Sequence, residues 1–172
     1  MQLPHIKKLT FLSVTCIFLS QLLFGQITQP AGVETYSIRK EFVLDAGEIY
    51  TLTNGQKTKA INYADGFGRP LQSIVAAGSP TGKDIVSFSK YDEYGRQPKQ
   101  WLPFEAATTN GAYNNMSTIL TTQLDFYNPN TAASKKIAGD IYPYAESSFE
   151  TSPLGRVLKV GGVGDSFQLN QH

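Results

Sequence analysis

The chain is poor in the two side chains most often used for nucleophilic and metal chemistry. Its 172 residues include one cysteine, Cys16, and two histidines, His5 and His172. Cys16 and His5 lie in an N-terminal segment that we expect to be removed. The mature chain would then have no thiol and would keep only His172, which excludes disulfide bonds, Cys–His and Ser–His–Asp catalysis, and histidine-based metal sites.

Charge of either sign is also scarce. Charged residues make up 17% of the chain, and 15 Lys and Arg against 14 Asp and Glu give a net charge of +1. No long run of one sign occurs, so the sequence lacks the basic stripe of a nucleic-acid-binding protein and the polybasic patch of a protein that binds anionic lipid. The 41% hydrophobic and 12% aromatic residues favour a folded, strand-rich domain over disorder.

The N-terminus has the pattern of a bacterial Sec-type signal peptide. Lys7 and Lys8 precede the apolar run Leu9–Phe24, and Gly25 follows as a small residue at a plausible cleavage site. The run is shorter than the ~20 residues that a membrane-spanning helix needs. We therefore predict that residues 1–25 are a cleaved signal peptide, and that the protein is secreted or held in the cell envelope or at the cell surface without a membrane segment.

Two other interpretations of this segment are weaker. An uncleaved membrane anchor would need a longer apolar run. A lipoprotein would be lipidated at Cys16, but Ser13-Val14-Thr15 fits the required motif poorly and little apolar sequence precedes it.

The remaining chain has the patterns of a mainly β domain. We expect an extended leader at 26–34, a β-rich domain at 35–160, and a Gly-rich linker or truncated end at 161–172. Alternating segments separated by turn signals predict two strands within 35–53, with a turn at 45–47, then an antiparallel meander at 59–63, 69–77, 84–91 and 96–102, and extended segments at 141–144 and 149–160. The strand at 69–77 should place Gln72 and Ile74 on one face. A three-to-four spacing of apolar residues predicts one short amphipathic helix within 112–128.

Three turns share one pattern, in which an aromatic strand end precedes an acidic turn and Gly-Arg begins the next strand. The shared positions are Tyr63, Asp65, Gly68 and Arg69; Tyr91, Asp92, Gly95 and Arg96; and, in the weaker copy Phe149–Lys159, Gly155 and Arg156. Glycine can adopt the positive φ that a tight hairpin needs. We expect each arginine to lay its stem on the aromatic ring and to reach the turn carboxylate. The alternative is three ordinary hairpin turns that share Gly-Arg by coincidence.

At these residues the chain resembles a known family. Tyr91-Asp92-x-x-Gly95-Arg96 resembles the YD repeat of Rhs proteins, which insecticidal Tc toxins and teneurins share. The wider segment 36–162 is similar to the N-terminal domain of unknown function that precedes such repeats in large secreted bacterial proteins. In that family, tandem repeats build a long β-sheet that coils into a shell.

The resemblance implies an antiparallel hairpin sheet of the YD-repeat type and a structural, non-enzymatic role, in which this chain contributes hairpins to a larger sheet or shell. It also implies a partner, either further YD/Rhs repeats or the strand edge of another protein. The chain itself carries neither a long repeat array nor the Rhs core motif, so it is similar to the entry segment of a shell or to a truncated copy.

Two patterns that suggest catalysis are weak. Gly78-x-x-x-Gly82-Lys83-Asp84 is one residue shorter than a phosphate-binding loop, and Asp84 replaces the hydroxyl residue that binds magnesium, so we predict a hairpin loop. Asp65, Asp92 and Glu93 are the residue types used in glycoside hydrolysis, but acids in turns are usually solvated. We therefore predict no enzyme activity, no cofactor and no metal.

An aromatic group suggests the alternative function. Trp101, together with Tyr94 and Phe104, has the chemistry of a platform that stacks on a sugar ring. Aromatic residues at strand spacing are more often part of a core. The alternative to a structural segment is thus a carbohydrate- or cell-surface-binding β module with a glycan ligand.

Overall fold

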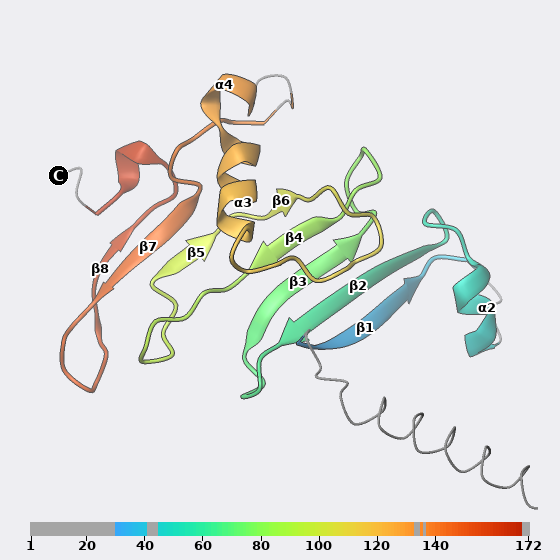
Figure 1. The fold of residues 1–172 in the computed structure, drawn as a ribbon, viewed down its shortest axis with the longest axis horizontal. Helices are drawn as coiled ribbons and strands as arrows, with labels where there is room; N and C mark the ends of the chain where they lie inside the picture. Colours follow the sequence, from blue (N-terminus) through green and yellow to red (C-terminus); the bar gives the residue numbers. More distant parts are fainter. Residues whose placement is uncertain (1–29, 41–44, 133–134, 136, 170–172) are drawn as a thin grey trace, which may run out of the picture.

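The computed structural model describes residues 30–40, 45–132, 135 and 137–169, and within them eight strands form two antiparallel sheets (Figure 1). The first sheet has the order β1 (Ala31–Ile38), β2 (Lys57–Ala64), β3 (Pro70–Ala76), β4 (Ile85–Phe88) and β6 (Phe104–Glu105). The second has the order β5 (Lys99–Trp101), β7 (Tyr144–Phe149) and β8 (Val157–Gly161). The prediction of a mainly β, antiparallel fold is confirmed.

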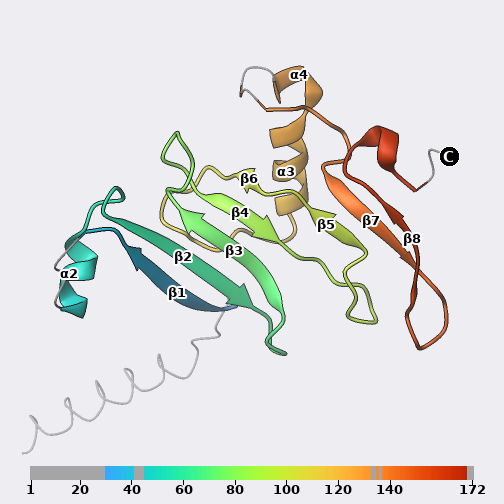
Figure 2. The same ribbon diagram turned by 180° about the vertical axis from the view of Figure 1, so that it is seen from behind.

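The hydrophobic core lies on one face of the first sheet. In β3 the side chains of Gln72 and Ile74 are buried while Ser73 between them is exposed, which confirms the predicted alternation. α3 (Ile119–Tyr127) and the segment before it cover this face, and Figure 2 shows the opposite face, which neither of them covers. The buried cluster at the centre of the core consists of Ile74, Val86, Phe88, Phe104, Ala106 and Ile119.

The predicted helix exists but begins at Ile119, later than the apolar spacing within 112–128 indicates. The buried side chain of Gln72 pairs with the backbone of Asn114, since its amide donates to the Asn114 carbonyl and its carbonyl accepts the Asn114 N–H. This pairing holds the segment extended across β3. The helix ends at Asn128, as Asn128-Pro129 predicts, and a further short helix, α4 (Pro129–Ala132), follows.

The second strand predicted within 35–53 is wrong, because residues 46–51 form the short helix α2 (Ala46–Thr51). Asp45 caps this helix through a 3.0 Å hydrogen bond from the Gly47 N–H to its carboxylate. Tyr50 and Leu52 are two residues apart, which fits a strand, but Ile49 and Leu52 are three apart, which fits one helical turn. β1 also begins at Ala31, inside the predicted leader, because it pairs with β2 along its whole length.

The meander predicted through 96–102 breaks after β4. The chain turns at residues 92–96 and then enters the second sheet, where β5 pairs with β7, while β4 pairs with β6 (Figure 1). Pro98 has no N–H for a strand ladder, and its carbonyl instead accepts the Ser147 N–H at 2.8 Å. The turn that was expected to close a simple hairpin therefore connects two sheets.

The Gly-rich segment from residue 161 is folded as far as residue 169, unlike the linker or truncated end predicted there. Gly161 is the last residue of β8, and a 3₁₀ turn, η2 (Asp165–Phe167), follows. The buried Gln168 side chain donates hydrogen bonds to the carbonyls of Tyr144, Gly162 and Gly164. The segment thereby packs back onto the start of β7.

The predicted signal peptide, residues 1–25, lies outside the described residues, as do His5, Cys16 and His172. None of the helices within the described ranges has the length and hydrophobicity that a bilayer crossing requires.

Candidate functional site

The first Gly-Arg turn is closed by one carboxylate. Asp65 Oδ1 accepts the backbone N–H groups of Phe67 and Arg69, both at 2.9 Å, and Asp65 Oδ2 accepts the Arg69 Nε–H at 2.7 Å. The Asp65 N–H donates to the Arg69 carbonyl at 2.9 Å, so the chain reverses direction between these two residues. Gly68 has a φ of +78°, which confirms the predicted requirement for glycine.

The second turn repeats these contacts almost to the tenth of an ångström. Asp92 Oδ1 accepts the N–H groups of Tyr94 at 3.0 Å and Arg96 at 2.9 Å, and Asp92 Oδ2 accepts the Arg96 Nε–H at 2.8 Å. Gly95 has a φ of +77°. Two segments with different flanking strands therefore form one turn structure, which favours a repeat over coincidence.

The third turn is a longer variant of the same structure. Glu150 takes the place of the aspartate, and its Oε1 accepts both the backbone N–H and the Nε–H of Arg156 at 3.1 Å. Ser152 donates its hydroxyl to the same oxygen and accepts the Leu154 N–H, which fills the extra length. Gly155 again has a positive φ, +58°. The extra side-chain length of glutamate lets it span a turn that is two residues longer.

These hydrogen bonds set the charge state of the turn acids. Desolvation opposes ionisation of Asp65 and Asp92, but the hydrogen bonds from Arg69 and Arg96 outweigh it and hold the pKa of each carboxyl below 3.8. The Ser152 hydroxyl and then the Arg156 backbone N–H lower the pKa of Glu150 below 4.5. All three acids are thus ionised at neutral pH, and each accepts hydrogen bonds from residues of its own turn.

Each of the first two arginines also contacts the aromatic residue of the next turn. The guanidinium carbon of Arg69 lies 4.4 Å from the centre of the Tyr91 ring, and that of Arg96 lies 4.6 Å from the centre of the Phe149 ring. Both distances are in the range of cation–π attraction. We call these contacts rungs, because each joins one Gly-Arg turn to the following one.

The glycines also leave room for the rungs. A Cβ on Gly95 would lie 3.0 Å from Nη1 of Arg69, and a Cβ on Gly155 would lie 3.5 Å from Cδ of Arg96. The glycine of each later turn thus receives the arginine of the turn before it. Sequence reasoning found only the conformational role of these residues.

The strands beside the two rungs pair in one register. β3 follows Arg69 and pairs with β4, with Gln72 opposite Phe88, three residues before Tyr91. β5 follows Arg96 and pairs with β7, with Lys99 opposite Glu146, three residues before Phe149. In both cases the strand that follows the arginine lies antiparallel to the strand that leads to the ring, and the register, if continued, places the arginine opposite the ring.

Tyr63 does not occupy the ring position that the sequence pattern assigned to it. The residue directly before Asp65 is Ala64, whereas Tyr91 and Phe149 stand directly before the acid of the other two turns. Tyr63 instead points to the core side, donates its hydroxyl to the Gly111 carbonyl at 2.9 Å and packs edge-on against Tyr113. The first turn therefore lacks a ring that could receive an arginine from an earlier turn.

The predicted sugar platform does not form as one surface. Phe104 is 1% exposed within the core, while Tyr94 is 73% exposed and lies beside Arg96. Trp101 is half-buried and packs against Phe88 and Tyr144, with ring centres 5.6 and 4.6 Å away.

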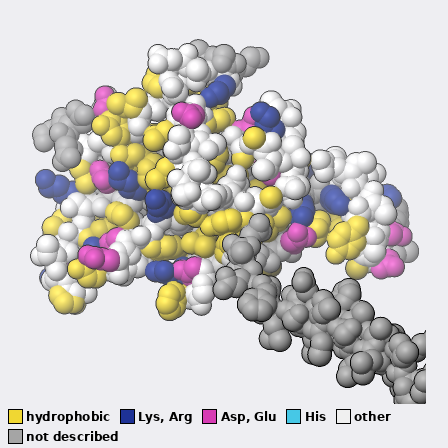
Figure 3. All heavy atoms as spheres, viewed as in Figure 1, with side chains coloured by type: hydrophobic (Ala, Val, Ile, Leu, Met, Phe, Trp, Pro, Cys, Tyr) yellow, Lys and Arg dark blue, Asp and Glu magenta, His cyan; other side chains and the backbone are white. Residues whose placement is uncertain are grey.

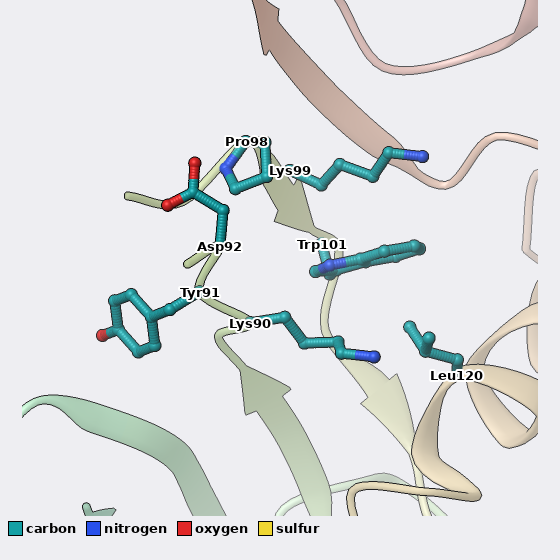
Figure 4. Close-up of a pocket in the computed structure, with 7 residues that line it drawn as sticks. All are labelled: Lys90, Tyr91, Asp92, Pro98, Lys99, Trp101 and Leu120. Atoms are coloured by element: carbon teal, nitrogen blue, oxygen red, sulfur yellow. The ribbon is translucent and has the colours of Figure 1, made fainter. Parts of the chain in front are cut away.

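Trp101 nevertheless lines a pocket of about 240 Å³ (Figure 4). Figure 4 shows its ring between the side chains of Lys90 and Lys99. The remaining lining residues are Tyr91, Asp92, Pro98 and Leu120.

Asp84 has a structural role. In the sequence it was noted only because it replaces the hydroxyl residue of a phosphate-binding loop. Residues 78–82 form a loop between β3 and β4, as predicted. The Asp84 side chain is fully buried, and its two oxygens accept the N–H groups of Ala77 at 2.9 Å and Gly111 at 2.8 Å. Sequence reasoning missed this role because Gly111 is distant in the chain.

Among the described residues, no group of three or more Asp, Glu, His and Cys side chains is placed to hold a metal ion. Of the acids considered for hydrolysis, Asp65 and Asp92 are engaged by their own turns, and Glu93 is exposed at the tip of the second turn.

Comparison with family models shows where the chain belongs. A family model described as a domain of unknown function, DUF6443, matches residues 36–172. No curated protein and no solved structure matches this chain.

Proposed function

Since the chain belongs to the DUF6443 family of domains of unknown function, whose description assigns no activity, we propose a function from the turn geometry: the chain is a non-enzymatic structural segment of an exported protein of the Rhs/YD-repeat type. Its hairpins contribute to a larger sheet or shell. Further YD/Rhs repeats, or the strand edge of a partner protein, continue that sheet.

The repeated rung is the observation that carries this proposal. Arg69–Tyr91 and Arg96–Phe149 have the same distance within 0.2 Å and the same strand register, although they lie in different sheets. A unit that joins to its successor through one fixed contact can be added many times. This is the mechanical requirement of a repeat that builds an extended sheet.

The chemistry of the turn acids supports a structural role over a catalytic one. A general acid or base needs a carboxylate whose pKa lies near the working pH and that can reach a substrate. Asp65 and Asp92 have lowered pKa values and spend both oxygens on their own turns. The resemblance of Tyr91-Asp92-x-x-Gly95-Arg96 to the YD repeat, and the signal-like residues 1–25, point the same way.

The experiment is peptide-mapping mass spectrometry of the native polypeptide that carries this segment, purified separately from culture medium, envelope and cytoplasm. The proposal predicts a polypeptide outside the cytoplasm, cleaved near Gly25, that contains further aromatic–Asp–x–x–Gly–Arg copies or is bound to a chain that does. A cytoplasmic polypeptide without further copies, alone or in complex, would contradict it.

The pocket beside Trp101 favours a second candidate, a carbohydrate- or surface-binding module. It combines an aromatic residue with two lysines and a tyrosine around an open space of about 240 Å³. Glycan-array binding that is lost in Trp101→Ala and kept in Arg39→Gln, with folding unchanged in both, would support it. Absence of binding by the parent chain to any glycan would rule it out.

A further inference from the structure

The third arginine differs from the first two. Side-chain exposure is 39% for Arg69 and 26% for Arg96, whose rungs are filled, but 70% for Arg156. Arg156 keeps its ion pair with Glu150 at 3.1 Å, yet no ring among the described residues lies over its guanidinium. The third turn is therefore formed, but no aromatic ring of the described residues stacks on its arginine.

The strand that follows Arg156 is also open on one side. Among the described residues, β8 pairs only with β7 and forms an edge of the second sheet, as Figure 1 shows. Val157, Leu158 and Val160 are 53%, 63% and 71% exposed. The segment after β8 covers only its end, since the Gly162 N–H donates to the Phe167 carbonyl at 2.9 Å. An exposed apolar edge of this kind is a template for another strand.

The Arg69–Tyr91 and Arg96–Phe149 contacts indicate which kind of strand would bind at this edge. We infer that Arg156 and the outer edge of Val157–Val160 bind an antiparallel strand that ends in an aromatic residue, with the ring stacked on Arg156. The register follows from the pairs Gln72–Phe88 and Lys99–Glu146: Lys159 lies opposite the residue three positions before the ring.

The charge of β8 adds a further requirement. Lys159 stands three residues after Arg156, as Lys99 stands three after Arg96, and Lys99 forms a 3.7 Å ion pair with Glu146. The preferred occupant therefore has an acidic residue three positions before its ring. This inference rests on the proposed function and specifies the partner of its open edge.

The chain supplies a probe with this pattern. The synthetic peptide of residues 144–156 has Glu146 three positions before Phe149 and carries its own Gly-Arg turn. Titrated into the isotopically labelled full chain, it should shift the NMR signals of the Val157–Val160 amides. Replacing phenylalanine by leucine in the peptide keeps an apolar residue but removes the cation–π attraction, and should weaken binding about fivefold.

The matched protein variants are Arg156→Gln and Arg39→Gln. Each removes one guanidinium, but Arg39 lies beside β1, an edge strand of the first sheet. We expect about fivefold weaker binding only for Arg156→Gln. The phenylalanine-to-leucine peptide leaves the protein unchanged, so it gives an answer even if Arg156→Gln disturbs the third turn.

Register is tested by disulfide trapping. In a Cys16→Ser chain with Lys159→Cys, a peptide with cysteine in place of Glu146 should cross-link faster than one with cysteine in place of Ser147, because a one-residue shift turns the side chain to the other face. Three results would overturn the inference. They are equal cross-linking rates for the two peptides, an affinity that neither Arg156→Gln nor the phenylalanine-to-leucine peptide changes, and no binding at millimolar peptide. A dimer of the chain that already fills this edge would also overturn it.

The two proposals fail separately. A native polypeptide without further repeats would contradict the proposed function even if the peptide binds, whereas a peptide that does not bind would leave the proposed function standing and remove only the occupant of β8.

Discussion

The guanidinium of Arg69 lies 4.4 Å from the centre of the Tyr91 ring, and this contact joins the first Gly-Arg turn to the second. Arg96 and Phe149 repeat it across a different pair of strands. The contacts run in one direction along the chain, from the arginine of one turn to the ring of the next. The first turn has Ala64 in place of a ring, so it cannot stack on an arginine. Arg156 of the third turn is exposed, and no ring among the described residues stacks on it.

The first prediction concerns the energy of this contact. A double-mutant cycle with Arg69→Ala and Tyr91→Ala should give a coupling free energy of about 1 kcal/mol in urea unfolding, the size of a partly exposed cation–π pair. The Tyr91 hydroxyl also donates to the Pro70 carbonyl. A second cycle should therefore start from the Tyr91→Phe chain and replace residues 69 and 91 by alanine. Its coupling free energy should equal that of the first cycle, because phenylalanine keeps the ring. Additive effects of the two alanine substitutions would contradict a rung.

The second prediction concerns Asp84. Its buried carboxylate accepts two backbone N–H groups, and Asp84→Asn replaces one accepting oxygen with an amide that donates. We expect a loss of about 2 kcal/mol in the free energy of unfolding, the size of the penalty for a buried N–H that is left without an acceptor. The exposed acid Glu93 is the matched control, since Glu93→Gln should change stability by less than about 0.5 kcal/mol. Equal effects would show that Asp84 is not essential to the packing.

Local signals predicted much of the fold, because they depend on residues close in sequence. The glycines at 68, 95 and 155, each following an acidic turn residue and preceding an arginine, predict all three turns, and the structure gives each a positive φ. The alternation around Gln72 and Ile74 predicts the buried face of β3. Sequence reasoning therefore located the turn acids, glycines and arginines of the candidate site correctly.

The rest depended on tertiary partners that no local pattern contains. Residues 46–51 fit a strand or a helical turn equally well, and the cap from Asp45 decides for the helix. Tyr63 packs on the core side because its hydroxyl reaches the carbonyl of Gly111, which is distant in the chain. The rungs were missed because Phe149 is brought to Arg96 only by the pairing of β5 with β7, which is distant in the chain.

The third prediction separates strain from collision at two glycines. Gly68 and Gly111 have φ values of +78° and +80°, but a Cβ on Gly68 meets nothing within 4 Å, whereas a Cβ on Gly111 would collide with Cδ1 of Ile61. Gly68→Ala should cost about 1 kcal/mol from the left-handed backbone alone, and Gly111→Ala about 1–3 kcal/mol more from overpacking.

The collision term has its own check. Ile61→Val removes Cδ1, so it should make Gly111→Ala less costly while leaving the cost of Gly68→Ala unchanged. Thermal or urea unfolding of the parent, the three single variants and the two double variants with Ile61→Val gives both differences. Equal costs for the two alanine substitutions would contradict the packing of Gly111 against β2.

The fourth prediction is the pH dependence of stability. The pKa values of Asp65 and Asp92 lie below 3.8, and those of Glu34, Glu105 and Glu150 below 4.5, through hydrogen bonds that include those from Lys59 to Glu34 and from the Thr81 hydroxyl to Glu105. Because these values are depressed in the folded state, their contribution is complete above the unfolded-state pKa and is lost as the pH falls through the folded-state values.

Urea midpoints should therefore be level from pH 7 to about pH 5 and should fall steadily below about pH 4.5. The double variant Asp65→Asn, Asp92→Asn should show a shallower fall, since two of the depressed groups are gone. A stability that rises on acidification, or a double variant with the slope of the parent, would contradict the assigned hydrogen bonds.

The central claim is that Arg156 makes the exposed edge of β8 selective for a strand that carries an aromatic residue. Hydrogen exchange of the full chain tests this claim most directly. β1 and β8 are both edge strands, but only β8 follows a Gly-Arg turn. The account predicts that both edges exchange faster than the central strand β3 in the free chain, and that the peptide of residues 144–156 slows exchange in Val157–Val160 and leaves β1 unchanged. Protection of β1 and β8 alike, or of neither, would contradict it.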